Sequence, residues 1–381
     1  MKFTVNCPTS IHFGPGVSTS LTSLIGADCG AIALVRGSGG TASDPVARAL
    51  KGTGASVLEI RVAGEPSLAS VNAAFGACRE SDITHVVACG GGSVIDTGKA
   101  LAFCLSQDAE LPGRFSDIPS DRLGTRHGVH LIALPTTAGT GAEVTSNAVL
   151  SVEADRTKTS LRGRALFPEI ALVDLNLLSS APKHVVLNAG LDAVVQTIEA
   201  YTSRLATPFS DALTEPNVRA GLQAVRRVVE GPSAEDWSRI AWVSLSSGLA
   251  LANSGLGAAH GLAAVLGAEL GAPHGALCGR LIAPVLAQNR RLSAKSTQIS
   301  ARIETCIQAI SDQFPGGSDD DSFAGFDTWI SENGLPRLQD YGATPDGLTA
   351  WAERGLSASS TSKNPVPLTA DDLEVVLRNA L

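Results

Sequence analysis

Hydrophobic and polar residues follow two different periods along this chain, and the change falls near residue 181. Before it, short runs of β-branched and apolar residues, typical of buried strands, alternate with stretches that place apolar residues on one helical face. The strand-like runs are Ala31–Val35, Ser56–Val62, His85–Cys89, His130–Leu134 and Ile170–Asp174, and the helix-like stretches between the first four are Pro45–Lys51, Leu68–Glu80 and Val94–Ser106. This alternation predicts βαβ units, and therefore a largely parallel sheet covered by helices on both faces.

The rest of the chain carries only the helical period. After Ala181-Pro182 the strand signals stop, and apolar residues recur at helical spacing almost to the end. The helix-like stretches include Ala189–Ser203, Ser210–Glu230, Ala234–Asn253, Gly261–Leu270 and Leu277–Arg290. The sequence therefore predicts two domains, an α/β domain over residues 1–181 and an all-α domain over residues 182–381.

Three short polar motifs predict where helices begin. Asp44 is expected to cap a helix whose first residue is Pro45. Ser67 is expected to cap the helix-like stretch that starts at Leu68. Thr369-Ala370-Asp371-Asp372 resembles a capping box, in which two polar side chains satisfy each other's backbone N–H groups, and it predicts a final helix.

Composition narrows the classes of protein that fit this pattern. The 381 residues carry 29 Lys and Arg against 37 Asp and Glu, a formal net charge of −8, which argues against general nucleic-acid binding. No run of about 18 uncharged apolar residues and no secretory signal is visible, so we expect neither a membrane partner nor export. The seven cysteines include no C-x-x-C motif, which predicts reduced thiols in a cytoplasmic protein.

Two glycine-rich turns are candidate anion sites. Gly37-Ser38-Gly39-Gly40-Thr41-Ala42 matches the dinucleotide fingerprint G-x-G-x-x-A, with Glu59 at the usual spacing, but chance matches are frequent in a chain with 39 Gly. Gly90-Gly91-Gly92-Ser93 opens a helix-like stretch and has more glycines than a plain strand-to-helix turn needs. Because backbone N–H groups in such a turn can face one phosphate, we favour an anion site there over a plain turn.

A threonine-rich loop, Pro135–Glu143, follows another strand-like run. It offers the hydroxyls of Thr136, Thr137 and Thr140 beside two flexible glycines. The loop is expected at the carboxyl end of a strand, which is where ligands bind in open α/β sheets.

The helical half contains a candidate metal site. Asp192 and Gln196 are four residues apart and therefore share one helix face. His260 and His274 both lie among small residues that would let the backbone approach a ligand closely. A carboxylate, an amide and two imidazoles suit a divalent transition metal with an open position. Taken alone, each histidine is more often a structural residue.

Together these motifs resemble the iron-containing (group III) alcohol dehydrogenases along nearly the whole chain. The matching segments are Phe13-Gly14-Pro15-Gly16, Gly90–Lys99, Pro135–Glu143, Lys158 with Pro168, Ala171-Leu172-Val173-Asp174, Gly190–Tyr201, the His260/His274 pair, and Asn364-Pro365 with Pro367-Leu368-Thr369. The resemblance implies a Rossmann-like dinucleotide-binding domain and a helical metal-binding domain, an architecture shared with dehydroquinate synthases. It also implies an NAD(P)-dependent enzyme that interconverts a small alcohol and an aldehyde or ketone with one divalent metal, Fe or Zn.

The same resemblance assigns candidate cofactor residues. The pyrophosphate and nicotinamide turn would comprise Gly91, Gly92, Ser93 and Asp96. Further cofactor contacts would come from Thr136, Thr137 and Thr140, with Lys158 beside them, and Gly37 and Ser38 would line the adenosine end. The family often has an acidic residue at that end. Because none stands here and Arg36 is adjacent, we expect NADP(H) to be accepted at least as well as NAD(H).

The resemblance assigns the metal ligands with two departures. Asp192, His260 and His274 match the family's ligands, whereas Gln196 stands where the family usually has His. Ala264 stands where a second His usually follows, so a water or the cofactor ribose would have to relay the proton. Cys278, close behind His274, is expected near the site.

Other functions remain open at this stage. The alternatives are a maleylacetate-reductase-like enzyme and a glycerol-dehydrogenase-like enzyme, the latter from a group with the same two-domain architecture, although Pro135–Glu143 and Gly190–Tyr201 favour the alcohol dehydrogenase. From other classes, the chain resembles a dehydroquinate-synthase-like lyase, or a nucleotide-binding protein whose metal site has degraded. In each case a small-molecule substrate or ligand is expected, and for the dehydrogenase a homodimer.

Overall fold

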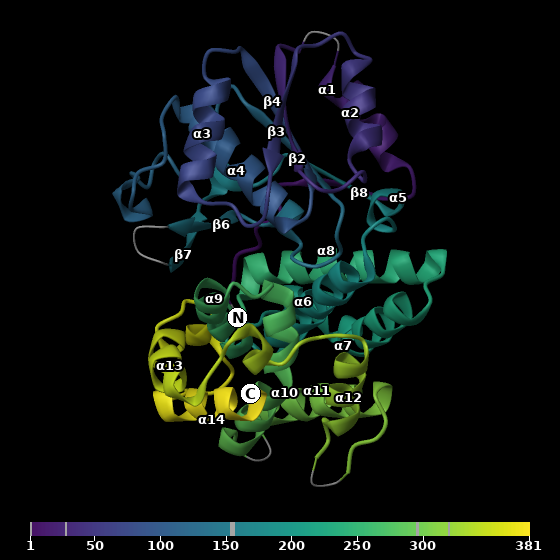
Figure 1. Ribbon diagram of the computed structural model, residues 1–381, viewed down its shortest axis with the longest axis vertical. Coiled ribbons are helices and arrows are strands. Elements are labelled where there is room, and N and C mark those ends of the chain that lie inside the picture. Colours follow the sequence, from purple (N-terminus) through teal and green to yellow (C-terminus); the bar gives the residue numbers. More distant parts are fainter. Residues whose placement is uncertain (1, 27–28, 153–156, 295–296, 319–320) are drawn as a thin grey trace. The chain divides into compact units, whose positions relative to one another are not determined.

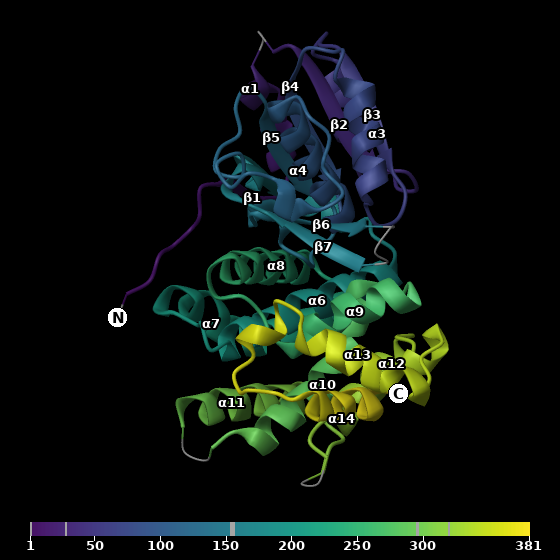
Figure 2. The same ribbon diagram turned by 90° about the vertical axis from the view of Figure 1, so that its left-hand side faces the viewer.

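The computed structural model describes residues 2–26, 29–152, 157–294, 297–318 and 321–381. The chain divides into two compact units, Cys7–Ala181 in one and Pro182–Leu381 together with the first six residues in the other. Figures 1 and 2 show the elements of each unit in two views.

The first unit, the α/β unit, is built on a six-stranded sheet in the order β1-β8-β5-β4-β2-β3. Every neighbouring pair in this sheet is parallel. Its strands are β1 (Ser10–Gly14), β2 (Ala31–Gly37), β3 (Val57–Val62), β4 (Ile83–Gly90), β5 (His130–Pro135) and β8 (Ile170–Asp174). The predicted parallel sheet is confirmed, and its predicted strands are correct to within two residues at each end.

Three strands were not predicted. The sheet-edge strand β1 is only five residues long. Strands β6 (Asn147–Val152) and β7 (Thr157–Arg162) form a separate antiparallel hairpin. Polar residues interrupt the apolar pattern of both hairpin strands, so no strand signal stands out from the sequence.

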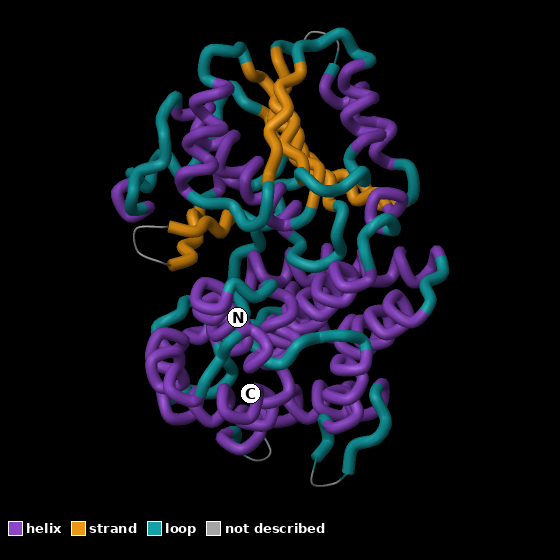
Figure 3. Tube along the Cα trace, in the orientation of Figure 1, coloured by secondary structure: helices purple, strands orange, loops and turns teal. Residues whose placement is uncertain are grey.

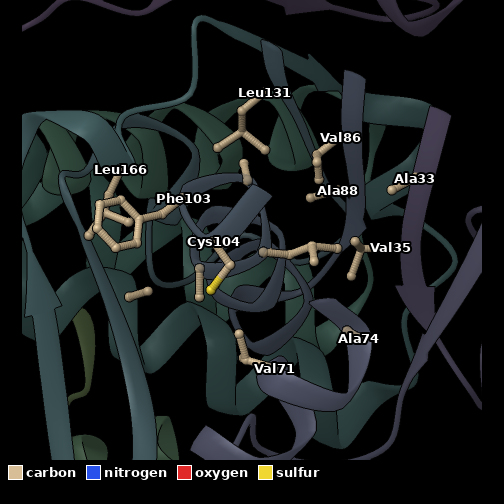
Figure 4. Packing of buried hydrophobic residues seen from close by; sticks show 14 of the residues in the cluster. Ala33, Val35, Val71, Ala74, Val86, Ala88, Phe103, Cys104, Leu131 and Leu166 are labelled. Carbon is tan, nitrogen blue, oxygen red and sulfur yellow. The ribbon is translucent and has the colours of Figure 1, made fainter. Parts of the chain in front are cut away.

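Helices cover both faces of the sheet because its central strands are apolar on both sides. On β2, Ala33 and Val35 point into one buried cluster while Ile32 and Leu34 point into another. The first cluster is covered by α3 (Leu68–Cys78) and α4 (Gly92–Gln107), the second by α1 (Leu21–Ile25), α2 (Asp44–Lys51) and α5 (Leu175–Leu178). Figure 4 shows the first cluster, with Phe103 and Cys104 of α4 close to Leu166 and Val71.

The carboxylate of Asp174 connects the segment Phe13–Gly16, which spans the end of the edge strand β1, to its own segment, Ala171–Asp174 on β8. This carboxylate accepts hydrogen bonds from the N–H of Gly16 at 2.8 Å and from the N–H and hydroxyl of Ser18 at 3.0 and 2.5 Å. Gly16 has a φ of 76°, which favours glycine. The turn after β1 and the end of β8 are therefore fixed to each other.

The predicted start of α2 is wrong by one residue. Ser43, not Asp44, is the N-cap, and Asp44 is the first residue of the helix. The Asp44 carboxylate instead pairs with the buried guanidinium of Arg36. Ser67 does cap α3, and it does so in a capping box with Ser70.

The second unit, the helical unit, contains only helices and connecting loops among its described residues, as Figure 3 shows by colour. The helices are α6 (Lys183–Thr202), α7 (Pro208–Glu230), α8 (Ala234–Ser254), α9 (Ala258–Leu270), α10 (His274–Leu292), α11 (Gln298–Gln313), α12 (Ala324–Glu332), α13 (Leu348–Leu356) and α14 (Ala370–Ala380). The capping box predicted at Thr369 is present at the start of α14. Helix α6 is buried without interruption from Gly190 to Thr202, with α7, α8 and α10 packed against it.

Short 3-10 helices join these elements. They are η1 (Val17–Ser20), η2 (Phe115–Asp117), η3 (Ala142–Val144), η5 (Arg164–Leu166), η6 (Leu338–Tyr341), η7 (Pro345–Gly347) and η8 (Thr361–Lys363). In the described part of the chain, no single helix is long and apolar enough to cross a membrane. Only α8 and α9, joined by a sharp bend, meet that length and composition together.

The close approach of α4 to the sheet gives a test of this packing. A Cβ on Gly98 of α4 would lie 2.6 Å from the Cβ of Ala88 on β4, whereas a Cβ on Gly76 of α3 would meet nothing within 4 Å. Gly98→Ala should lower the free energy of unfolding by about 1–3 kcal/mol, the usual cost of overpacking. The control Gly76→Ala should leave it unchanged or raise it by up to about 1 kcal/mol. Urea unfolding of both variants measures the difference, and equal stabilities would contradict the packing.

Candidate functional site

The glycine turn lies between β4 and α4. Gly90 ends the strand, Gly91 is the N-cap, and Gly92 is the first residue of the helix. The first N–H groups of a helix have no acceptor within it, and the helix dipole adds partial positive charge there. The turn therefore has the local structure that binds a phosphate group.

The threonine-rich loop packs directly on this turn. The N–H of Thr136 donates to the Gly90 carbonyl at 2.9 Å. A Cβ on Gly91 would lie 3.2 Å from the Thr137 hydroxyl, and one on Gly92 would lie 2.9 Å from the Thr140 methyl group. The missing Cβ atoms thus admit the threonines, and the two predicted cofactor segments meet at the carboxyl ends of β4 and β5.

The first glycine cluster follows β2 at the same edge of the sheet. Arg36 of β2 is in register with Cys89 of β4, so Gly37 lies next to the glycine turn at the end of β4. A Cβ on Gly37 would meet nothing within 4 Å, and the Ser38 N–H donates to the Val62 carbonyl at 3.0 Å. The end of β2 is therefore open enough to line a ligand.

Both cations expected to attract a phosphorylated cofactor are paired inside the protein. Arg36, whose side chain is 5% exposed, pairs with Asp44 and lies 3.8 Å from Glu59. Lys158, on β7, pairs with Glu65 at 2.5 Å, and its side chain is 8% exposed. Neither is available to a phosphate without giving up its carboxylate.

Asp96 points toward the hairpin strand β6. One of its carboxylate oxygens accepts the Val149 N–H at 2.9 Å, and the other lies 3.9 Å from the Lys99 ammonium. Lys99 is fully buried and donates to the Thr145 hydroxyl at 2.8 Å and the Asn147 carbonyl at 2.9 Å. These contacts hold α4 against β6.

Burial shifts the pKa values of this cluster. It raises the pKa of Asp96 to about 6 and lowers the pKa of Lys99 to about 8. It also raises the pKa of nearby Glu143, a buried residue of η3, to about 7. Lys99 and Glu143 were not predicted to lie close together, because their proximity depends on how the loop after β5 folds.

The helical unit brings three of the predicted metal ligands together. Asp192 lies in the middle of α6, His260 is the third residue of α9, and His274 is the first residue of α10. The His260 Nε2 is 3.3 Å from the Asp192 Oδ1, and the His274 Nε2 is 3.9 Å from the same oxygen. Asp192 and His260 are buried, and His274 is partly exposed.

Two atoms of this cluster are buried without a hydrogen-bond partner among the described groups. They are the Asp192 Oδ1 and the His260 Nε2. A buried carboxylate oxygen and a buried imidazole nitrogen left unpaired are costly unless a ligand satisfies them. Because both are ligand atoms for divalent transition metals, the residues present fit a metal ion.

Cys278 belongs to the same cluster. Its thiol lies 3.6 Å from the His274 Nε2, and one ligand atom from each of Asp192, His260, His274 and Cys278 lies within 4.8 Å of the others. Burial would raise the pKa of the Cys278 thiol, but the two imidazoles lower it below its ordinary value. Cys278 follows His274 by four residues, and this spacing places both side chains on one face of α10.

Gln196 lies one turn after Asp192 on α6. Its Nε2 donates to the Ser247 hydroxyl at 2.9 Å, and that hydroxyl donates to the Ser244 carbonyl at 2.9 Å. These contacts with α8 fix the orientation of the carboxamide.

Glu199, which was not among the predicted site residues, contacts the nitrogen of His260 that faces away from Asp192. Its carboxylate accepts the His260 Nδ1–H at 2.7 Å and the N–H groups of Gly257 and Ala259 at 3.0 and 2.7 Å. Glu199 is buried and lies seven residues after Asp192, on the same helix face. It fixes the tautomer of His260, so that Nε2 faces Asp192, and it caps the start of α9.

Glycines let α10 approach α6 closely enough to complete the cluster. A Cβ on Gly275 would lie 2.1 Å from the Asn188 carbonyl oxygen, and one on Gly279 would lie 2.7 Å from the Leu191 Cδ1. Larger residues at these two positions would push His274 and Cys278 away from Asp192.

A parallel sheet with a glycine turn suited to a phosphate, followed by a helical unit with a carboxylate–imidazole cluster, is the combination expected of a nucleotide-dependent metalloenzyme. Residues 8–175 match the sequence profile of iron-containing alcohol dehydrogenase, and residues 186–381 match the C-terminal profile of the same family. The chain belongs to the iron-containing alcohol dehydrogenase family.

Individual proteins agree with this assignment. The chain is 31% identical to a probable alcohol dehydrogenase, EutG, of Salmonella typhimurium over 79% of this chain and 74% of that protein. It is 26% identical to an NAD-dependent methanol dehydrogenase of Bacillus methanolicus over 83% of this chain and 82% of that one. A crystal structure of an iron-containing alcohol dehydrogenase superposes with a TM-score of 0.83 at 25% identity, covering 100% and 99% of the two chains.

The family fixes the general activity. The protein is an oxidoreductase that uses a divalent metal and NAD(H) and acts on small alcohols or aldehydes. These comparisons favour the predicted dehydrogenase over the predicted lyase and over a nucleotide-binding protein without chemistry.

The buried Glu143 carboxyl predicts a pH dependence of stability. Its raised pKa means that the folded protein keeps a proton that the unfolded chain releases, so its contribution to stability falls as pH rises from about 4.5 to about 7. The loss amounts to at most about 3 kcal/mol. Glu143→Gln, which cannot ionise, should therefore flatten the fall in melting temperature across this window.

The matched control for this prediction is Glu110→Gln, at an exposed carboxyl group of the same unit. It should keep the wild-type pH profile of the melting temperature. A Glu143→Gln profile parallel to the wild type would contradict the assignment of a buried proton to Glu143.

Proposed function

We propose that this protein is an NAD(H)-linked alcohol dehydrogenase whose divalent metal is held by Asp192, His260 and His274, with Gln196 beside them. The observation that carries this proposal is the pair of buried, unpartnered atoms, Asp192 Oδ1 and His260 Nε2, 3.3 Å apart. A cation there supplies Lewis acidity to the substrate's alcohol or carbonyl oxygen.

The chain's own residues orient the reacting partners. The backbone N–H groups of Gly91, Gly92 and Ser93 bind the cofactor pyrophosphate at the start of α4. Thr136, Thr137 and Thr140 line the same turn and contact the cofactor. A nicotinamide cofactor held there would supply the hydride chemistry.

Asp96 and Ala264 are not expected to take part directly in the reaction. The Asp96 carboxylate is engaged by Val149 and lies near Lys99, so it positions α4 rather than touching the nicotinamide. The Ala264 side chain cannot carry a proton, so the relay would need a water or a ribose hydroxyl of the cofactor.

The pairing of the two cations bears on cofactor preference. Gly37 and Ser38 present no carboxylate to repel a 2′-phosphate, which was the reason to expect NADP(H). However, Arg36 and Lys158 are already neutralised by Asp44 and Glu65, so neither adds affinity for that phosphate. We therefore propose that NAD(H) is used at least as well as NADP(H).

We further propose that the enzyme works in the cytoplasm as a homodimer. All seven cysteines are free thiols, which suits a reducing compartment. The strand β1 forms one edge of the sheet, and such an edge can pair with a second copy. Light scattering on the purified protein determines the mass of the assembly.

The proposal is tested with protein stripped by a chelator and reloaded with Fe²⁺, Zn²⁺ or Mn²⁺. Activity on a panel of short primary alcohols and aldehydes should require the metal, with kcat/KM for NADH equal to or above that for NADPH. Glycerol and maleylacetate in the same panel test the two alternative substrates. His274→Ala should lose most of the activity and bound metal.

The matched control for this experiment is His184→Ala, at an exposed histidine of the same unit, which should behave as wild type. Full activity in metal-free protein would overturn the proposal. A hundredfold preference for NADPH would show that the carboxylates release Arg36 or Lys158 to the cofactor.

Glu199 gives a second test of the metal site. Glu199→Gln keeps the shape of the side chain but removes the charge that orients His260 and caps α9. The loss of such a partner typically lowers metal affinity by about 10–100-fold. Competition with a chelator measures this affinity in the purified protein.

The control is Glu235→Gln, at a carboxylate on α8 whose side chain is 72% exposed, and it should bind metal as the wild type does. If Glu199→Gln and Glu235→Gln held the metal equally tightly, Glu199 would not support the site.

A further inference from the structure

We propose that the Cys278 thiolate is a fourth ligand of the metal ion, so that the donor set is Asp192, His260, His274 and Cys278. This inference rests on the metal-dependent function proposed above. It assigns to a cysteine the ligand position that opens where Gln196 stands in place of the usual histidine.

Two of the separations between the ligand atoms match those of a tetrahedral site, and a third is slightly longer. Nitrogen and oxygen ligands lie about 2.0–2.1 Å from Zn²⁺ and sulfur about 2.3 Å, so two ligands at a tetrahedral angle are about 3.3–3.6 Å apart. The Asp192 Oδ1 and His260 Nε2 are 3.3 Å apart, and the Cys278 Sγ and His274 Nε2 are 3.6 Å apart. The His274 Nε2 is 3.9 Å from the Asp192 Oδ1.

The backbone directs Cys278 to this point. His274 and Cys278 occupy successive turns of α10, and residues four apart share a helix face. Gly275 and Gly279 let this part of α10 pack against α6 with contacts that a Cβ would block. Cys278 is fully buried, so its sulfur faces the cluster and not solvent.

A thiolate also balances the charge of the site. Asp192 and a Cys278 thiolate together carry two negative charges, which cancel the charge of a divalent ion. Since burying net charge is costly, this balance favours the thiolate over a neutral ligand. Soft sulfur with imidazole and carboxylate suits Zn²⁺ and Co²⁺, and such ions accept a fifth ligand when substrate binds.

Gln196 is a weaker candidate for this role. Its carboxamide is oriented by the Ser247 hydroxyl, and amide oxygen is the preferred donor for hard cations rather than for Zn²⁺. Sulfur is therefore the stronger of the two donors that the chain offers near Asp192.

Cobalt substitution tests the proposal, because a thiolate bound to Co²⁺ gives a charge-transfer absorption band in the near ultraviolet. Wild-type protein loaded with Co²⁺ should show this band. Cys278→Ser should lose it and bind Co²⁺ at least roughly tenfold more weakly, the lower limit for losing even an outer partner of a metal.

The matched control is Cys306→Ser, at another fully buried cysteine of the helical unit, on α11. It should keep the band and the affinity for Co²⁺. X-ray absorption at the zinc edge of Zn²⁺-loaded wild-type protein gives a readout that needs no variant, and one sulfur at about 2.3 Å is expected.

The outcomes separate this inference from the proposed function. Wild-type protein that binds Co²⁺ without the band, or a zinc shell of nitrogen and oxygen alone, overturns the inference and leaves the metal-dependent function standing. Wild-type protein that binds neither Zn²⁺ nor Co²⁺ overturns both.

Discussion

The helical unit is organised around a buried carboxylate, Asp192, that faces the imidazoles of His260 and His274. Asp192 lies in the part of α6 that is buried without interruption, and one of its oxygens has no hydrogen-bond partner among the described groups. A buried carboxylate costs several kcal/mol unless a counter-charge or donors compensate it. The starts of α9 and α10 supply imidazoles, which are metal ligands rather than permanent cations. The helices are thus arranged for a bound cation.

A second carboxylate on the same helix makes the metal cluster and the helix packing one structure. Glu199 contacts the opposite side of the His260 ring from Asp192, so the imidazole is held between two carboxylates. The same Glu199 carboxylate accepts backbone N–H groups at the start of α9. The Glu199 carboxylate thus contacts both the His260 ring and the start of α9. A change in the position of α9 is therefore expected to change the orientation of the His260 ring.

Much of the fold was predictable from the sequence, and the limits have physical causes. The strands β2, β4 and β5 are apolar on both faces, and α6 to α10 keep a helical period over many residues, so their signals are strong. The hairpin of β6 and β7 is stabilised by pairing and by Lys99 rather than by an apolar pattern. Such contacts depend on the folded chain.

In the candidate site, too, some residues could be predicted from the sequence and others could not. Asp192, His260 and His274 could be found by motif resemblance, and Cys278 and Glu199 lie at helical spacings from His274 and Asp192 that share a face. The partners of Gln196, Arg36 and Lys158 could not be found in this way. They are Ser247, Asp44 and Glu65, and each is brought close by packing of separate elements.

Some buried charged groups have partners within the protein and some buried polar atoms have none, and this difference indicates where a ligand binds. The side chains of Arg36, Lys158 and Lys99 are at most 8% exposed, and each has a carboxylate within 4 Å. Among the described residues, the buried side-chain atoms without a hydrogen-bond partner are Arg36 Nε, Asp192 Oδ1 and His260 Nε2. Two of these lie 3.3 Å apart in the proposed metal cluster, whereas the third belongs to a guanidinium that is already paired with Asp44. The Asp192 and His260 atoms are therefore the ones that a bound cation would satisfy.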